Sequence, residues 1–117
     1  MAVVNDTSTE VSTLYGKGSL ATWTALATGD TGKPVSGVGL SDRSVQMTGT
    51  FGGATVVLEG SNDGPNYTTL TDTAGTALSF TSAGLKQVLQ ITKYIRPSVS
   101  GGAGVSINCN VLMVGRK

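Results

Sequence analysis

The sequence predicts an all-β protein that folds as a single antiparallel β-sandwich or jelly roll with an extended N-terminal arm. Short runs of alternating apolar and polar residues recur along the chain, as half-buried strands require. Turn-forming residues separate these runs about every 8–12 residues, which is typical of sandwiches. Glycine makes up 17 of the 117 residues, and this length suits one domain.

Residues 1–18 differ from the rest of the chain and predict an arm, which leaves 19–117 as the sandwich domain. The apolar residues of the arm follow no clean period: Val3, Val4, Val11, Leu14 and Tyr15. They are too few to form a core, so we expect them to contact a neighbouring copy or another protein. A disordered tail and a single helical turn at 11–15 are the alternatives.

The first strand of the body is expected at 19–27, where threonines alternate with Trp23 and aliphatic residues. Residues 28–43 are rich in Gly, Ser, Asp and Pro and predict a long loop, with a short edge strand near 35–40. Residues 44–51 and 54–59 both alternate, and Gly52-Gly53 separates them. Two alternating runs around two glycines predict a β-hairpin.

The second half of the chain continues as short strands between turns. Turns are expected at 60–66, 72–75 and 81–84, and strands at 67–70, 77–80, 85–91, 94–99 and 105–113. A helical turn at 85–89 is an alternative to that strand. Pro97 cannot donate to a ladder, which predicts that the strand at 94–99 either lies at a sheet edge or ends at Pro97. The longest alternating run, 105–113, predicts a central strand with Cys109 buried on its apolar face.

The residues needed for common catalytic and metal sites are scarce. The chain has no His and one Cys, so it lacks a Ser-His-Asp or Cys-His arrangement and the common zinc ligand sets. The acids lie mostly at predicted turns, and the segment 61–64 lacks the EF-hand spacing of a calcium loop. We therefore expect no enzyme activity, no cofactor and no metal site.

Charge and hydropathy limit the partners. Eight basic and seven acidic residues are dispersed along the chain, which argues against nucleic-acid binding. No apolar stretch is long enough for a membrane span, and no secretion signal is visible. A net charge of +1 gives little protection against self-association.

The sequence from residue 44 onward resembles a group of small tailed-phage virion proteins. The resemblance lies in VVLEGSNDG (56–64), Tyr67 and Leu70, TSAGL (81–85), YIRP (94–97), and a glycine-rich loop before a closing alternating strand. It covers about the last three-fifths of the chain. Members of this group are taken to be head decoration, or cement, proteins with a β-sandwich or jelly-roll body.

The resemblance implies a virion structural protein that is made in the host cytoplasm and stabilises a capsid by binding its outer surface. The implied partners are the major capsid protein and further copies of the chain, as a homotrimer in preference to a dimer. Tyr94 and Arg96 lie on the polar face of their strand and are candidate contact residues in addition to the arm, with exposure to solvent alone as the alternative. The alternative is a carbohydrate- or receptor-binding module of a phage fibre or tail, which would need Trp23 or Tyr67 flat and exposed.

Overall fold

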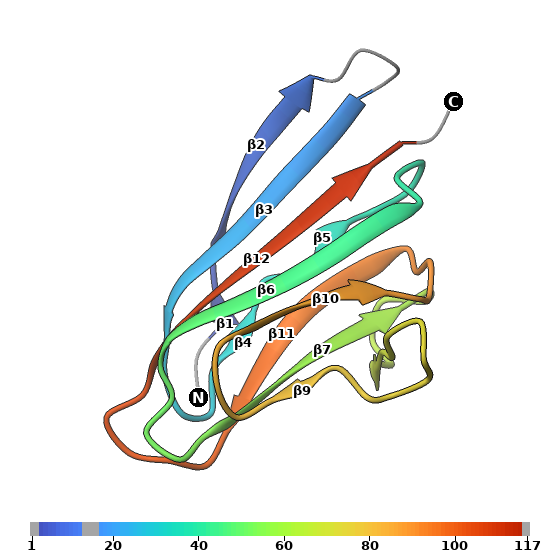
Figure 1. Cartoon of the computed structure of the whole chain (residues 1–117). Coiled ribbons are helices and arrows are strands. Elements are labelled where there is room, and N and C mark those ends of the chain that lie inside the picture. Colours follow the sequence, from blue (N-terminus) through green and yellow to red (C-terminus); the bar gives the residue numbers. More distant parts are fainter. Residues whose placement is uncertain (1–2, 13–16, 116–117) are drawn as a thin grey trace.

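The computed structural model describes residues 3–12 and 17–115, with the backbone alone described for 8–12 and 17. The regular structure of these residues is β, and two sheets stack as a sandwich (Figure 1), which confirms the predicted fold class. The strands are β1 (Val3–Val4), β2 (Asp6–Ser12), β3 (Lys17–Leu26), β4 (Thr31–Gly32), β5 (Val35–Ser36), β6 (Asp42–Thr50), β7 (Thr55–Ser61), β8 (Thr68–Thr69), β9 (Ser79–Phe80), β10 (Gly84–Val88), β11 (Tyr94–Ser100) and β12 (Ser106–Val114).

The five-stranded sheet has the order β10-β6-β12-β3-β2, with every neighbouring pair antiparallel. Its centre is β12, as the long alternating run at 105–113 predicts. Ile107, Cys109, Val111 and Met113 point into the core, and the residues between them face outward. The alternation therefore determines which face of β12 packs against the other sheet.

The seven-stranded sheet has the order β1-β4-β11-β7-β8, with β5 also on β11 and β9 also on β7. Its strand β11 lies inside the sheet, so the edge position predicted from Pro97 is wrong. β11 pairs with β7 along its whole length, and on its other side with β5 at Tyr94 and Ile95 and with β4 at Ser98. The Cδ atom of Pro97 faces Gly32 of β4, lying 2.5 Å from where a Cβ on that glycine would stand. The missing N–H thus falls at the gap between β5 and β4, where no ladder bond is lost.

The expected hairpin around Gly52-Gly53 is also wrong, because the chain crosses here from one sheet to the other. β6 pairs with β10 and β12, whereas β7 pairs with β11, β8 and β9. The two glycines do form a tight turn, with the Ala54 amide donating to the Phe51 carbonyl at 2.8 Å. The Gly52 carbonyl accepts from the Ala103 amide of the loop before β12, at 3.0 Å. Strands that bury one face each can pair side by side or lie in opposite sheets, so alternation and a turn do not define the pairing.

The N-terminal segment differs from the expected arm, because residues 3–12 pair with strands of their own chain. β2 lies antiparallel to β3 over seven residue pairs, and β1 lies parallel to β4. The Val4 carbonyl accepts a hydrogen bond from the Lys33 amide at 2.7 Å, and the Val4 side chain packs against the core. Without β2, the outer edge of β3 would leave a row of backbone groups unpaired.

The remaining strands are close to those expected. The strand predicted at 19–27 is β3, while the loop at 28–43 contains the two short strands β4 and β5. The segments 67–70, 77–80 and 85–91 shorten to β8, β9 and β10, with residues 84–88 a strand and not a helical turn. The core fills the space between the sheets and consists mainly of fully buried aliphatic residues with Trp23, Met47, Cys109 and Met113.

Candidate binding surfaces

Within the described residues, no three His, Cys, Asp or Glu side chains gather where they could hold a metal ion. Cys109 is fully buried in the core, and this burial raises the pKa of its thiol well above the ordinary range. The thiolate that a nucleophile requires is therefore not formed near neutral pH. No helix of the described chain is both long and apolar enough to cross a membrane.

The outer face of the seven-stranded sheet carries a group of side chains that we name the tyrosine–arginine cluster: Glu59, Tyr67, Tyr94 and Arg96. Arg96 and Glu59 are directly opposite each other on β11 and β7, and the Arg96 Nε atom lies 2.7 Å from Glu59 Oε1. The Arg96 guanidinium also lies 3.8 Å from the centre of the Tyr67 ring. Its terminal N–H groups have no partner in the described part of the chain.

Charged and polar neighbours contact this cluster and shift the pKa values of groups in and beside it. Partial burial raises the pKa of Tyr67, and the positive charge of Arg96 opposes this rise. Lys93 lies 5.3 Å from the centre of the Tyr94 ring. Hydrogen bonds from Asn66 hold the Asp63 carboxylate and lower the pKa of that group, although it is fully exposed. The predicted contact residues Tyr94 and Arg96 thus belong to one organised surface.

The two aromatic side chains considered for a carbohydrate site differ in their exposure. Trp23 has no exposed surface, and its Nε1 donates to the Lys33 carbonyl at 3.0 Å. The Tyr67 ring is covered on one side by Arg96. The single tryptophan therefore belongs to the core.

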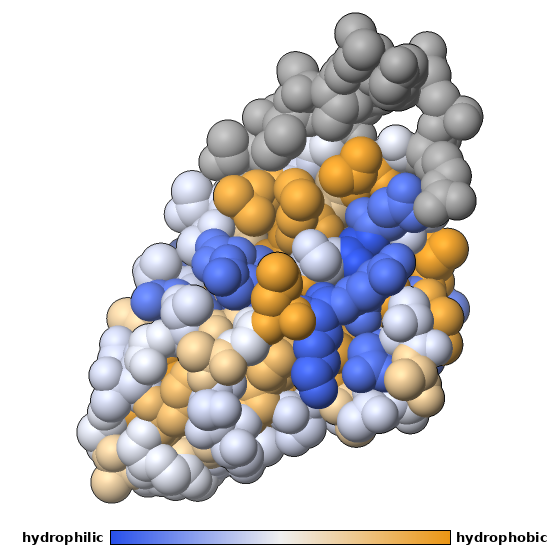
Figure 2. All heavy atoms as spheres, in the orientation of Figure 1, coloured by the Kyte–Doolittle hydropathy of each residue, from blue (hydrophilic) through white to orange (hydrophobic). Residues whose placement is uncertain are grey.

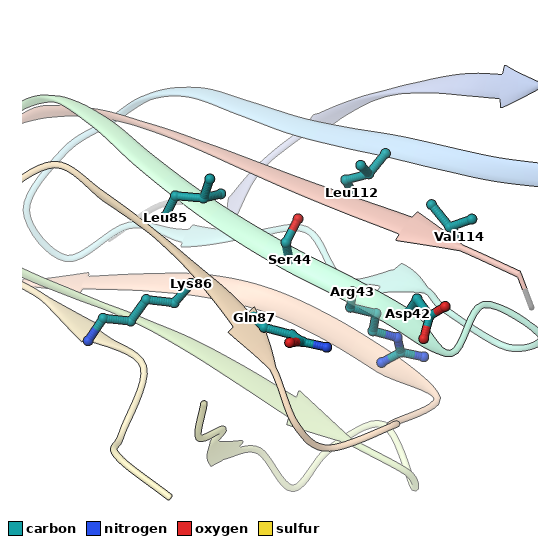
Figure 3. A pocket seen from close by; sticks show the side chains of 8 residues that line it. All are labelled: Asp42, Arg43, Ser44, Leu85, Lys86, Gln87, Leu112 and Val114. Carbon is teal, nitrogen blue, oxygen red and sulfur yellow. The ribbon is translucent and has the colours of Figure 1, made fainter. Parts of the chain in front are cut away.

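The outer face of the five-stranded sheet carries apolar side chains that we name the apolar face: Leu20, Leu85, Leu112 and Val114. Leu85 is 66% exposed and Leu112 is 37% exposed. A shallow groove of about 390 Å³ runs between them over the small side chain of Ser44 (Figure 3). Figure 2 shows apolar side chains gathered on this side of the molecule, next to hydrophilic ones.

The structure describes the side chains of only two of the predicted arm residues, Val3 and Val4. Val3 is exposed, Val4 packs against the core, and Leu14 and Tyr15 lie outside the described residues. The register places Val11 opposite Gly18, which is itself opposite Val114 of the apolar face.

Sequence reasoning missed Leu85 and Leu112. All four residues of the run 111–114 are apolar. Because alternate residues of a strand face opposite sides, two of them had to face outward, and this pattern could have predicted Leu112 as an exposed apolar residue.

Comparison with known proteins identifies a shared fold. No model of a known protein family matches the chain, and no curated protein matches it in sequence. Among solved structures, the chain is similar to the SPBc2 prophage-derived protein YomS, with a TM-score of 0.64 and 12% sequence identity. The likeness covers 88% of this chain and 96% of the YomS chain.

Proposed function

We propose that this chain is a structural protein of a tailed-bacteriophage particle and that it decorates the outside of the capsid without catalysing a reaction. Two findings support a phage origin. The segments from residue 56 to the closing strand resemble phage decoration proteins, and the fold is shared with a prophage-derived protein. The lack of histidine and the burial of the single cysteine agree with a binding role.

The observation that carries the proposal is the tyrosine–arginine cluster. Tyrosine and arginine are enriched among the residues that contribute most to protein interfaces. Arg96 is already held by Glu59 and by the Tyr67 ring, so little side-chain freedom is lost when a partner binds. Its open N–H groups suit a carboxylate or main-chain carbonyls on the capsid protein.

A capsid presents the same site many times, so a modest contact at each site is enough for a stable coat. Copies that also touch one another gain further avidity, because each bound copy holds the next one near its site. The rigid sandwich suits this role, since its outer faces are fixed by the alternation of the strands.

The test is binding to capsids purified from a phage mutant that lacks this protein. In co-sedimentation, we expect saturable binding of the natural chain and at least a tenfold weaker affinity for a variant that combines Tyr94→Ala with Arg96→Met. The matched control is Lys86→Met, because Lys86 also lies over an aromatic ring, that of Phe80, but on another strand. The proposal fails if the natural chain does not bind, or if the double variant binds as well as the control.

A further inference from the structure

We propose that two copies of this chain pair face to face through the apolar face of the five-stranded sheet. The partner is a second copy of the chain, and the contact forms in solution without a capsid. The inference is therefore independent of the proposed function and of the tyrosine–arginine cluster, which lies on the other sheet.

The fold leaves large aliphatic side chains of this face exposed to solvent. Leu112 and Leu20 are directly opposite each other on β12 and β3, and Ser44 of β6 is opposite Leu112 on its other side. Leu85 lies one strand further, opposite Gln46, so the leucines belong to one continuous area of sheet. Exposed aliphatic side chains that lie close together on a sheet face mark an interaction site, because they gain free energy by leaving water.

The distribution of charge on this face favours a second copy of the chain as the partner. The outward positions of the five-stranded sheet are occupied mainly by serine, threonine, asparagine, glutamine, leucine and valine. Among the described residues, Asp42 is the single charged residue at these positions, and it lies at one end of the sheet. Lys86 and Arg43 also border the groove, but their side chains point to the opposite side of the sheet (Figure 3). A face without central charges can meet its own copy with no like-charge repulsion. A highly charged partner would instead lose hydration here without gaining an ion pair.

The spacing of the two exposed leucines allows a symmetric contact. Ser44 lies between Leu85 and Leu112 and leaves a hollow flanked by two leucines (Figure 3). A two-fold axis in the plane of the contact, passing over Ser44, brings Leu85 of each copy against Leu112 of the other. Such an isologous contact closes on itself and gives a dimer, the commonest symmetry of soluble assemblies. This arrangement favours the dimer over the trimer that the phage resemblance implies.

The first experiment measures the mass of the full chain by sedimentation equilibrium over a concentration series. We expect a monomer–dimer equilibrium, and at least a tenfold higher dissociation constant for the variant L85S/L112S. The matched control is Leu89→Ser, because Leu89 is an exposed leucine that does not line the groove. Circular dichroism checks that each variant keeps its sheets. A monomer up to roughly 100 µM, a trimer, or a dimer that the double variant leaves unchanged would each overturn the proposal.

The second experiment tests the geometry by cross-linking. The buried Cys109 does not compete, so single cysteines can be placed at the two leucine positions. A mixture of Leu85→Cys and Leu112→Cys chains should give a mixed disulfide-linked dimer under mild oxidation, in preference to either chain linked to itself. Preferred linkage of like chains would overturn the two-fold arrangement.

Discussion

Replacing Arg43 with Met should destabilise the fold and release two loops from each other. Arg43 is 2% exposed, and its Nε donates to the Leu40 carbonyl at 2.8 Å. Its Nη2 donates to the Gly37 carbonyl at 2.7 Å and to the Thr92 carbonyl at 2.9 Å. One cation therefore ties the loop before β6 to the loop before β11.

Two opposing effects decide the magnitude. Hydrogen bonds from a charged donor contribute about 1.5–3 kcal/mol each, so three of them represent roughly 5–9 kcal/mol. Against this, burying a cation costs several kcal/mol, and its removal relieves that cost. Burial lowers the pKa of Arg43, and its Nη1 atom is buried without a hydrogen-bond partner in the described chain. Both observations indicate that the folded state carries a desolvation cost at this guanidinium. We expect a net loss of about 2–3 kcal/mol, because the buried Gly37 carbonyl stays unpaired in the variant.

Urea unfolding at one fixed protein concentration measures this loss. With a slope of about 2 kcal/mol per molar urea, the midpoint should fall by about 1 M or slightly more. The Gly37 amide donates to the Lys93 carbonyl across the same two loops, so its hydrogen exchange should accelerate. The control is Lys33→Met, an exposed cation whose loss should change stability by less than about 0.5 kcal/mol. An unchanged or higher midpoint for Arg43→Met would refute the reasoning, since desolvation would then outweigh the hydrogen bonds.

Three further predictions concern the core and one turn. Gly32→Ala should cost about 2–3 kcal/mol in urea unfolding, because its Cβ would stand 2.6 Å from the Trp23 Nε1 atom; unchanged stability would contradict the packing. The Cys109 thiol should react with a disulfide reagent only when urea unfolds the chain, and reaction at a rate independent of urea would show that it is accessible. Asn66→Ala removes the side-chain hydrogen bond and should raise the pKa of Asp63 toward its ordinary value in a carboxyl NMR titration, whereas an unmoved pKa would exclude that bond as the main cause.

Much of the fold follows from local pattern. The alternation in β12 predicts its place and its buried face, because each inward position must be apolar when both sheets cover the core. The same reasoning places Cys109 inside. These features depend on the sequence of one strand and on no partner strand.

Features that depend on which strands pair were predicted less well. The turn at Gly52-Gly53 is a property of two residues, but crossing to the other sheet depends on the loop that carries Ala103, about fifty residues away in the sequence. The position of Pro97 inside the sheet likewise requires the gap between β4 and β5. Local sequence cannot show such long-range pairing.

The binding surfaces also combine features that one strand determines with features that strand pairing determines. Tyr94 and Arg96 were predicted as contact residues from their polar strand face, whereas the ion pair with Glu59 arises from the register of β11 and β7. The apolar face was missed because its residues come from β3, β10 and β12, which come together only in the folded sheet, with β6 between β10 and β12.

Immunogold electron microscopy of virus particles, purified from cultures in which the chain is expressed, tests the proposed function most directly. The antibody is raised against the purified chain, and particles from a strain without the gene are the control. We predict gold label distributed over the surface of intact heads, because a decoration protein occupies repeated sites on the capsid. Label confined to the tail or its fibres, or particles without label, would contradict capsid decoration.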